Sequence, residues 1–243
     1  MNASLCSIIT KNIADRIIST TPFPSNIIPL WVIEVFCGQG NICRKVGVQS
    51  RKDDELVAIG TFFNFDEETT LKQDIILETV EEGWWYCATL PNQQVTTTLF
   101  TDATITKEKQ LHKFENWINL LFKTRYAKNK IQQAKSREKL WTRNAFSQIT
   151  DITTKKNFLA VGDAIAAFDP ISSMGIGFAM SSACNAAKAI IDTNNDYDTI
   201  VNYQENINAI YRNYLNIKSS FYQKERRWEE AAFWQSRLAN VLV

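Results

Sequence analysis

A short segment, residues 157–187, carries the residues whose types and spacing could do chemistry. Gly162, Asp163 and Ala164 follow the apolar run 158–161, which is typical of a buried strand. Ligands of open α/β folds sit at the carboxyl ends of such strands. Gly162 would let a ligand approach the backbone closely, and the carboxylate of Asp163 could accept hydrogen bonds from the ligand's hydroxyl groups.

The following turn and helix start could hold an electron-rich or anionic group. Pro170 fixes a turn, and Gly175 and Gly177 leave the beginning of the next helix free of side chains. From Ser173 to Gly177, exposed backbone N–H groups and the positive end of a helix dipole would face such a ligand. Small residues further along would let this helix pack closely on the sheet: Ala179, Ser181, Ser182, Ala183, Ala186 and Ala187.

Few residues in the sequence are suited to metal binding, to a catalytic triad or to thiol redox chemistry. With one histidine, His112, neither a metal site nor a Ser-His-Asp triad is expected. The five cysteines are scattered and form no CxxC motif, so we expect reduced packing residues in a cytoplasmic protein. They are Cys6, Cys37, Cys43, Cys87 and Cys184.

The strands that must position the segment follow from the hydrophobic pattern. Three stretches rich in β-branched and aromatic residues, 55–65, 75–91 and 94–101, are separated by short turns. Consecutive strands this close pair antiparallel, because parallel pairing needs a crossover of about a dozen residues. The pattern therefore predicts an antiparallel sheet over residues 54–102. The apolar run 30–36 predicts a further buried strand that ends in a tight turn.

Helices are predicted in the remaining parts. From Lys107 apolar residues recur at helical spacing, and a second, more basic helix is expected over residues 126–136. A third is expected over residues 173–191. The tail is predicted to be helical from Asp198, with a polar break near Arg226.

Composition limits the partners. The 243 residues carry a formal net charge of +1, so no overall field favours nucleic acid or an anionic membrane. No stretch is as long and apolar as a membrane helix, and the first thirty residues lack the pattern of a secretory signal. The chain is therefore expected to be a soluble, cytoplasmic, globular protein.

The whole pattern, from the strand to the glycine-containing helix, resembles the second FAD-binding motif of flavoprotein monooxygenases and flavin-dependent halogenases. In that family the aspartate binds the ribityl chain, and the turn after the proline lies beside the isoalloxazine ring. The resemblance implies an FAD cofactor with its ribityl chain at Asp163, between Gly162 and Ala164. An ordinary strand-loop-helix is the alternative. The implied ring-facing loop consists of Pro170, Ser173, Gly175, Ile176 and Gly177.

Two further segments are similar to this family, in particular to flavoproteins related to tryptophan halogenases. Residues 83–91 look like its substrate-domain sheet, and residues 221–234 look like its carboxy-terminal helices. Trp85 and Tyr86 are predicted to line the substrate side, the alternative being that they are core residues. The halogenase signature Trp-x-Trp-x-Ile-Pro is replaced here by Trp-Trp-Tyr followed by Pro91, which favours oxygenation over halogenation.

The implied fold is α/β (α+β), a partial glutathione-reductase-type FAD-binding fold with an antiparallel substrate-domain sheet and a helical tail. Residues 1–53 would be a remnant of the FAD-binding domain, and residues 54–150 the substrate domain. Residues 151–195 would form the second FAD-binding motif, and residues 196–243 the carboxy-terminal helices.

The glycine-rich front end of such enzymes has no counterpart, since no GxGxxG occurs and residues 37–40 imitate it weakly. Either a separate chain supplies that half, or the protein is a shortened remnant with weak or no activity. The expected function is an FAD-dependent monooxygenase acting on an aromatic small molecule or a protein tryptophan. Alternatives are a flavin-dependent halogenase and a non-catalytic module. In that module the tail aromatics, Trp228, Phe233 and Trp234, would anchor another polypeptide; otherwise they cap the core.

Overall fold

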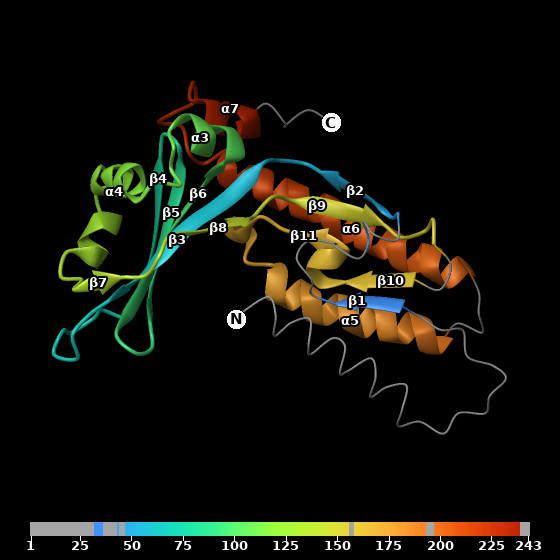
Figure 1. Ribbon diagram of the computed structural model, residues 1–243. Helices are drawn as coiled ribbons and strands as arrows, with labels where there is room; N and C mark the ends of the chain where they lie inside the picture. The colour runs from blue at the N-terminus through green and yellow to red at the C-terminus, as the bar shows by residue number, and fades with distance from the viewer. Residues whose placement is uncertain (1–31, 36–42, 44–46, 156–157, 193–196, 239–243) are drawn as a thin grey trace. The chain divides into compact units, whose positions relative to one another are not determined.

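The structure is a computed structural model, shown in Figure 1, and two compact units make up the chain. The first unit is drawn from residues 1–53 and 147–215, and the second from residues 54–146 and 216–243. Within the described part, no helix combines the length and the apolar character that crossing a bilayer demands. The functional roles predicted from the sequence for residues 1–53, 54–150, 151–195 and 196–243 stay predictions. The described residues are 32–35, 43, 47–155, 158–192 and 197–238.

Two sheets form the first unit. Strand β1 (Val32–Val35) pairs parallel with β10 (Phe158–Val161), with Val32 opposite Phe158. The antiparallel sheet has the order β11-β9-β2, from β2 (Gln49–Lys52), β9 (Gln148–Asp151) and β11 (Ala166–Ala167). The predicted strand at 158–161 is confirmed, and the one predicted at 30–36 is confirmed over the described residues 32–35. The tight turn predicted at 37–40 lies outside the described residues.

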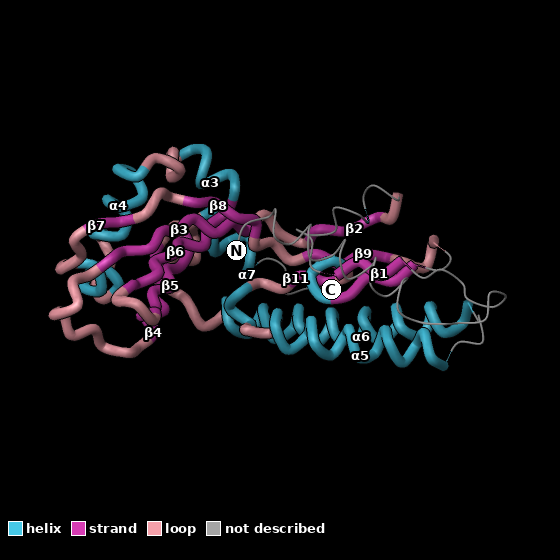
Figure 2. Tube along the Cα trace, turned by 60° about the horizontal axis from the view of Figure 1, so that its bottom comes forward, coloured by secondary structure: helices cyan, strands magenta, loops and turns pink. Residues whose placement is uncertain are grey.

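Two helices cover the strands of this unit on the same side, as Figure 2 shows. They are α5 (Gly175–Asp192) and the part of α6 (Tyr197–Tyr222) that belongs to the first unit. The hydroxyl of Tyr203 donates to the carbonyl of Ala160 (2.9 Å) and lies 3.4 Å from the carbonyl of Ser182. One α6 side chain therefore ties strand β10 to helix α5.

Strand β10 is buried along its whole length, as a parallel strand that reads as a continuous apolar run should be. Burying a large apolar side chain contributes about 1.5–3 kcal/mol. The segment with the predicted chemistry therefore rests on a well-packed base. The aromatic residues of the surrounding core are Phe158, Phe168, Phe178, Tyr203, Tyr211 and Tyr214.

The second unit contains a six-stranded sheet of order β4-β5-β6-β3-β7, with β8 also paired to β3. Every pairing in it is antiparallel, so the antiparallel sheet predicted over residues 54–102 is confirmed. The strands are β3 (Leu56–Asn64), β4 (Ile75–Val80), β5 (Gly83–Leu90), β6 (Gln94–Asp102), β7 (Ser136–Arg137) and β8 (Trp141–Asn144).

The prediction of one strand over residues 75–91 is wrong, because this stretch is the β4–β5 hairpin. Gly83 opens the second strand with φ +149°, and an added Cβ would come within 2.0 Å of the carbonyl oxygen of Phe100. Only glycine fits this close approach of two strands. Gly83 thus marks where the chain reverses.

Of the two helices predicted between the sheet and residue 136, the first is confirmed and the second is wrong. Helix α4 (Phe114–Phe122), preceded by α3 (Ala103–Glu108), bears out the helical spacing after Lys107, whereas the short 3-10 helix η1 (Ala127–Ile131) stands in place of the basic helix over 126–136. The carboxylate of Glu78 accepts hydrogen bonds from three backbone N–H groups at the start of η1, at 2.5, 2.9 and 2.8 Å. This distant anchor holds one turn, after which the chain joins the sheet as β7.

The end of the tail, from residue 216 on, is part of the second unit. After the predicted polar break, helix α7 (Ala232–Leu238) buries Phe233 and Trp234, and the Trp234 Nε1–H donates to the carbonyl of Val80 (2.9 Å). The interpretation of these aromatics as an exposed anchor is therefore wrong for Phe233 and Trp234, which cap the core. At the level of a mixed α/β fold with antiparallel sheets and carboxy-terminal helices, the predicted fold class is confirmed.

Candidate functional site

Gly162 ends strand β10 in a conformation that favours glycine. Its φ is +58°, in the left-handed region, and it begins the 3-10 turn η2 (Gly162–Ala164). Its backbone N–H donates to Oγ of Ser182 on helix α5 (2.9 Å), and that hydroxyl donates to the carbonyl of Ala179 (3.1 Å). The turn is thus fixed to the helix that follows it.

Strand β9 holds the other side of the turn. The carbonyl of Ala164 accepts a hydrogen bond from Oγ1 of Thr150 (2.9 Å), and the carbonyl of Asp163 accepts a longer one from Nε2 of Gln148 (3.4 Å). The backbone N–H of Ile165 closes the turn on the carbonyl of Gly162 (3.1 Å). The backbone from which the Asp163 side chain projects is therefore held from two sides.

The carboxylate of Asp163 is half-buried and accepts no hydrogen bond from any described residue. Burial raises its pKa, because desolvation disfavours the charged form. A partly desolvated carboxylate without a donor is costly in a purely structural role. It can receive hydrogen bonds from the hydroxyl groups of a ligand, and perturbed carboxylates of this kind gather at functional sites.

The turn between Asp169 and Ser173 is tightly made. In η3 (Pro170–Ser172), Oδ1 of the buried Asp169 accepts from the N–H of Ile171 (3.0 Å), and Oγ of Ser172 donates to the carbonyl of Asp169 (2.8 Å). Ser173 follows with φ +53°, which costs a residue other than glycine roughly 1–2 kcal/mol. Such strain is often kept where function requires it.

The beginning of α5 is open. An added Cβ at Gly175 or Gly177 would meet no atom within 4 Å among the residues that the structure describes, and the side chain of Ile176 is 80% exposed. The first-turn N–H groups of this 18-residue helix have no intrahelical acceptors. A planar, electron-rich group could therefore approach the backbone here without displacing protein atoms.

The structure brings most of the predicted site residues together. The turn η2 packs against helix α5, so Gly162, Asp163 and Ala164 adjoin the helix that begins with Gly175. Pro170 and Ser173 lie exposed on the connecting turn. Of the small residues expected to allow close packing, three are buried and three exposed. The buried ones are Ala179, Ser182 and Ala186; the exposed ones are Ser181, Ala183 and Ala187.

Trp85 and Tyr86 belong to the second unit and point to opposite faces of its sheet. Trp85 is fully buried, edge-on to Trp117 with ring centroids 4.9 Å apart. Tyr86 is half-buried on the other face. The ring of Trp85 therefore has no surface to offer a substrate in this structure, whereas Tyr86 does. A substrate-side role for Tyr86 stays a prediction.

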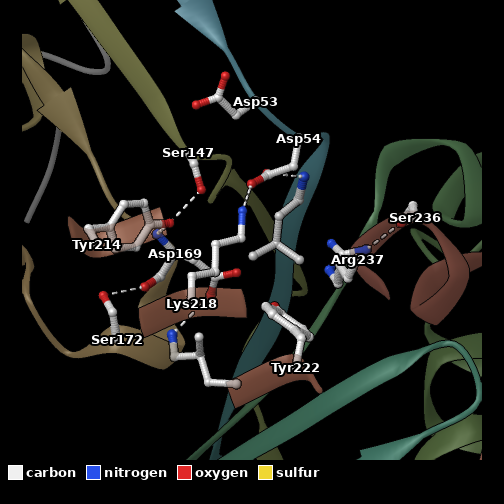
Figure 3. A network of polar contacts seen from close by, with 12 residues as sticks. Asp53, Asp54, Ser147, Asp169, Ser172, Tyr214, Lys218, Tyr222, Ser236 and Arg237 are labelled. Atoms are coloured by element: carbon white, nitrogen blue, oxygen red, sulfur yellow. Dashed lines mark hydrogen bonds and ion pairs between the residues drawn. The ribbon is translucent and has the colours of Figure 1, made fainter. Parts of the chain in front are cut away.

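Several residues that support the site were missed from the sequence. Ser182 and Thr150 hold the η2 turn, and a buried network of Ser147, Tyr214 and Asp169 lies behind the η3 turn (Figure 3). A small polar residue inside a helix was a weak signal for Ser182. Nothing in the local sequence marks Tyr214, because its partner Asp169 lies 45 residues away.

The other candidate sites in the described part of the structure, a cavity, metal-ligating groups and cysteines, lack the features of a cofactor site. A cavity of about 550 Å³ contains none of the predicted site residues. No group of three or more metal-ligating side chains gathers among the residues that can be described. Cys43 and Cys87 are free and buried, whereas Cys184 is free and exposed; Cys6 and Cys37 lie outside the described ranges. The cavity is lined by Asp66, Glu68, Thr69, Thr70, Gln132, Gln133, Ala134 and Lys135.

Known proteins match most of the chain. The tryptophan halogenase family matches residues 71–241. LodB of Marinomonas mediterranea, whose name describes it as an FAD-dependent oxidoreductase, is 35% identical over 210 residues. The alignment covers 86% of this chain and 56% of LodB, so the chain spans about half the length of this relative.

Solved structures share the fold. The flavin-dependent halogenase CmlS has a TM-score of 0.69 at 24% identity, covering 85% of this chain and 39% of its own. The myxobacterial chondrochloren halogenase CndH has a TM-score of 0.73 at 16% identity, and the match covers 85% of this chain and 50% of CndH. The peptidyl tryptophan dihydroxylase QhpG has a TM-score of 0.58 at 18% identity, and the match covers 77% of this chain and 44% of QhpG. At these identities the likeness concerns the fold alone.

Proposed function

The chain belongs to the tryptophan halogenase family, and from this premise we propose that residues 162–177 hold the ring end of FAD. The chain would serve in an oxidoreductase that oxygenates an aromatic substrate. The observation that carries the proposal is Asp163, at the end of a buried parallel strand: its half-buried carboxylate has no hydrogen-bond donor among the described residues.

The residues present fit such a cofactor. The carboxylate of Asp163 can accept hydrogen bonds from ribityl hydroxyl groups. The open backbone at Gly175 and Gly177 leaves room for a ring, and the first-turn N–H groups of α5 can donate to the oxygen and nitrogen atoms at its edge. The exposed side chain of Ile176 offers an apolar surface that a bound ring could cover.

When bound, FAD supplies the redox chemistry with oxygen. The part of the chain is to bind and orient. The hydrogen bonds of Gly162 and Ala164 fix the backbone on both sides of Asp163 before a ligand arrives, and such preorganisation lowers the entropic cost of binding.

The substrate class follows from the family and from one sequence departure. Two of the similar structures are named as halogenases and one as a peptidyl tryptophan dihydroxylase. The Trp-Trp-Tyr sequence at residues 84–86 departs from the halogenase signature, which favours oxygenation of an aromatic small molecule or of a tryptophan in another protein. Tyr86, half-buried on the sheet, is the residue we assign to the substrate side.

Binding of the ring end is tested with riboflavin, which carries the ring and the ribityl chain but no adenine. The purified chain is titrated into a fixed, low concentration of riboflavin while the flavin fluorescence is followed. We expect a saturable change that excess AMP does not reverse, because AMP carries neither recognised part. Unchanged fluorescence up to the highest protein concentration would overturn the proposal.

The reaction type is tested by mass spectrometry. The chain is incubated with reduced FAD, oxygen, chloride, bromide and a tryptophan-containing peptide. We expect a product that gains oxygen. A product in which halogen replaces hydrogen would turn the assignment to halogenation, and the absence of any product would contradict catalysis by this chain.

A further inference from the structure

A buried tyrosine lies behind the turn that precedes α5. Tyr214 of helix α6 is fully buried, and its hydroxyl accepts a hydrogen bond from the backbone N–H of Asp169 (2.8 Å). The same hydroxyl lies 2.6 Å from Oγ of Ser147 (Figure 3). Since the tyrosine oxygen accepts from Asp169, its own hydrogen is available to the serine.

The hydrogen bond that Tyr214 accepts comes from Asp169, the residue that organises the turn. Asp169 is fully buried, and its carboxylate accepts from the N–H of Ile171 (3.0 Å). Its carbonyl accepts from both the N–H (3.0 Å) and the hydroxyl (2.8 Å) of Ser172. The position of Asp169 therefore sets the path of the chain into Ser173 and the beginning of α5.

The ring of Tyr214 reaches the other end of the same segment. It packs edge-on to Phe168, with ring centroids 4.7 Å apart at 87°. Phe168 packs in the same manner on Phe178, in the first turn of α5, at 4.6 Å and 72°. One side chain thus supports the segment before the turn through a hydrogen bond and after it through stacked aromatic rings.

We propose that Tyr214 is a positioning residue that sets the loop from Asp169 to Phe178 for the flavin ring. The inference rests on the proposed function, because the loop includes the residues assigned to the ring. In this proposal Tyr214 does not contact the ligand; it affects ligand binding only by positioning the loop. Its hydroxyl accepts the hydrogen bond from the buried backbone N–H of Asp169, and removing the hydroxyl removes that acceptor.

The test removes only this hydroxyl. In Tyr214→Phe the ring contacts remain, and the matched control is Tyr211→Phe. Tyr211 lies one turn earlier on α6, is 1% exposed, and its hydroxyl donates to Oδ2 of Asp53 (2.8 Å), a residue that is not part of the loop. Each variant therefore removes one buried tyrosine hydroxyl, with its hydrogen bonds, from the same helix.

We expect both variants to unfold at lower temperature than the parent chain. Only Tyr214→Phe should bind riboflavin more weakly, by roughly tenfold, the loss typical of one hydrogen bond. It should also change the visible circular dichroism of the bound flavin, which reports the asymmetry around the ring. Hydrogen exchange of the amides from Ile171 to Phe178 should be faster in Tyr214→Phe alone.

The outcomes separate the two proposals. Equal riboflavin affinity and equal amide exchange in the two variants would reduce Tyr214 to a stabilising residue and overturn its assignment. If the parent chain binds no riboflavin but Tyr214→Phe still accelerates exchange in the loop, the flavin proposal falls and the control of the loop by Tyr214 stands.

Discussion

The backbone N–H of Gly162, at the end of strand β10, donates a hydrogen bond to Oγ of Ser182, two turns into helix α5 (2.9 Å). This bond fixes the end of the strand to the helix next to the position from which the Asp163 side chain projects. The conformation of Gly162 is left-handed, and the N–H is buried. The geometry of the site therefore depends on a serine hydroxyl as well as on glycine.

Removing that hydroxyl should destabilise the protein. In Ser182→Ala the buried N–H of Gly162 loses its acceptor, at a cost of about 1–3 kcal/mol in the free energy of unfolding. Urea denaturation measures the change. Ser181→Ala is the control, because this neighbour is exposed and its hydroxyl donates only to the carbonyl of Phe178 in its own helix. Equal stability of both variants would contradict the role of Ser182.

A side chain at the helix start should exclude the ligand without harming the fold. In Gly175→Val the first added carbon meets no described atom within 4 Å, so the free energy of unfolding should change by less than about 1 kcal/mol. The flavin ring would meet the new methyl groups, and riboflavin affinity should fall by more than roughly tenfold. Ser181→Val, on the exposed side of the same helix, should bind normally. Unchanged affinity in Gly175→Val would place the ring elsewhere.

The charge of Asp163 should cost stability in the absence of a ligand. Burial raises its folded-state pKa above the ordinary value of 3.8, so the folded protein binds more protons than the unfolded chain between the two pKa values. This contribution to stability is present below pH 3.8 and is lost as the pH rises through the folded pKa. Asp163→Asn should therefore be more stable than the parent at pH 7.

Denaturation curves across pH provide the check. The advantage of Asp163→Asn should shrink as the pH falls and vanish below about pH 4, where the aspartate is protonated in both states. A parent chain that is the more stable one at pH 7 would mean that its carboxylate has a stabilising partner. Asp151→Asn serves as the control, because that carboxylate is exposed and accepts from Thr153.

The cysteines should differ in reactivity. Burial raises the pKa of Cys87 to about 12, so at pH 8 its thiol stays protonated and enclosed. Cys43 is buried as well, whereas Cys184 on helix α5 is exposed. Mass spectrometry after brief maleimide treatment should find label on Cys184 in the native protein and on Cys43 and Cys87 only in urea. Native labelling of Cys87 would contradict the packing of the β5 strand.

The central turn could be predicted because its signals are local. The apolar run 158–161 predicts a buried strand and Gly162 permits the left-handed turn after it; the structure has the strand, the turn and the helix that follows. The supporting side chains could not be found in this way. Ser182 and Tyr214 act on residues 20 and 45 positions away, and no local pattern encodes such contacts.

Two errors had signals that were available. Trp85 and Tyr86 are neighbours in one strand, and successive side chains in a strand point to opposite faces, so both could not line one surface. Gly83 after two glutamates marked the hairpin between β4 and β5. The false helix over 126–136 had no such signal, because the carboxylate that holds η1 as one turn comes from Glu78, across the unit.

Binding of the ribityl chain by Asp163 is tested most directly by comparing riboflavin with lumiflavin, which has the ring but no ribityl chain. If Asp163 binds ribityl hydroxyls, the parent chain should bind riboflavin about 10–100-fold more tightly than lumiflavin, the value of hydrogen bonds to a charged group. Asp163→Ala should lose this preference and bind lumiflavin as the parent does. A variant that keeps the full preference for riboflavin would contradict the assignment of Asp163 to the ribityl chain.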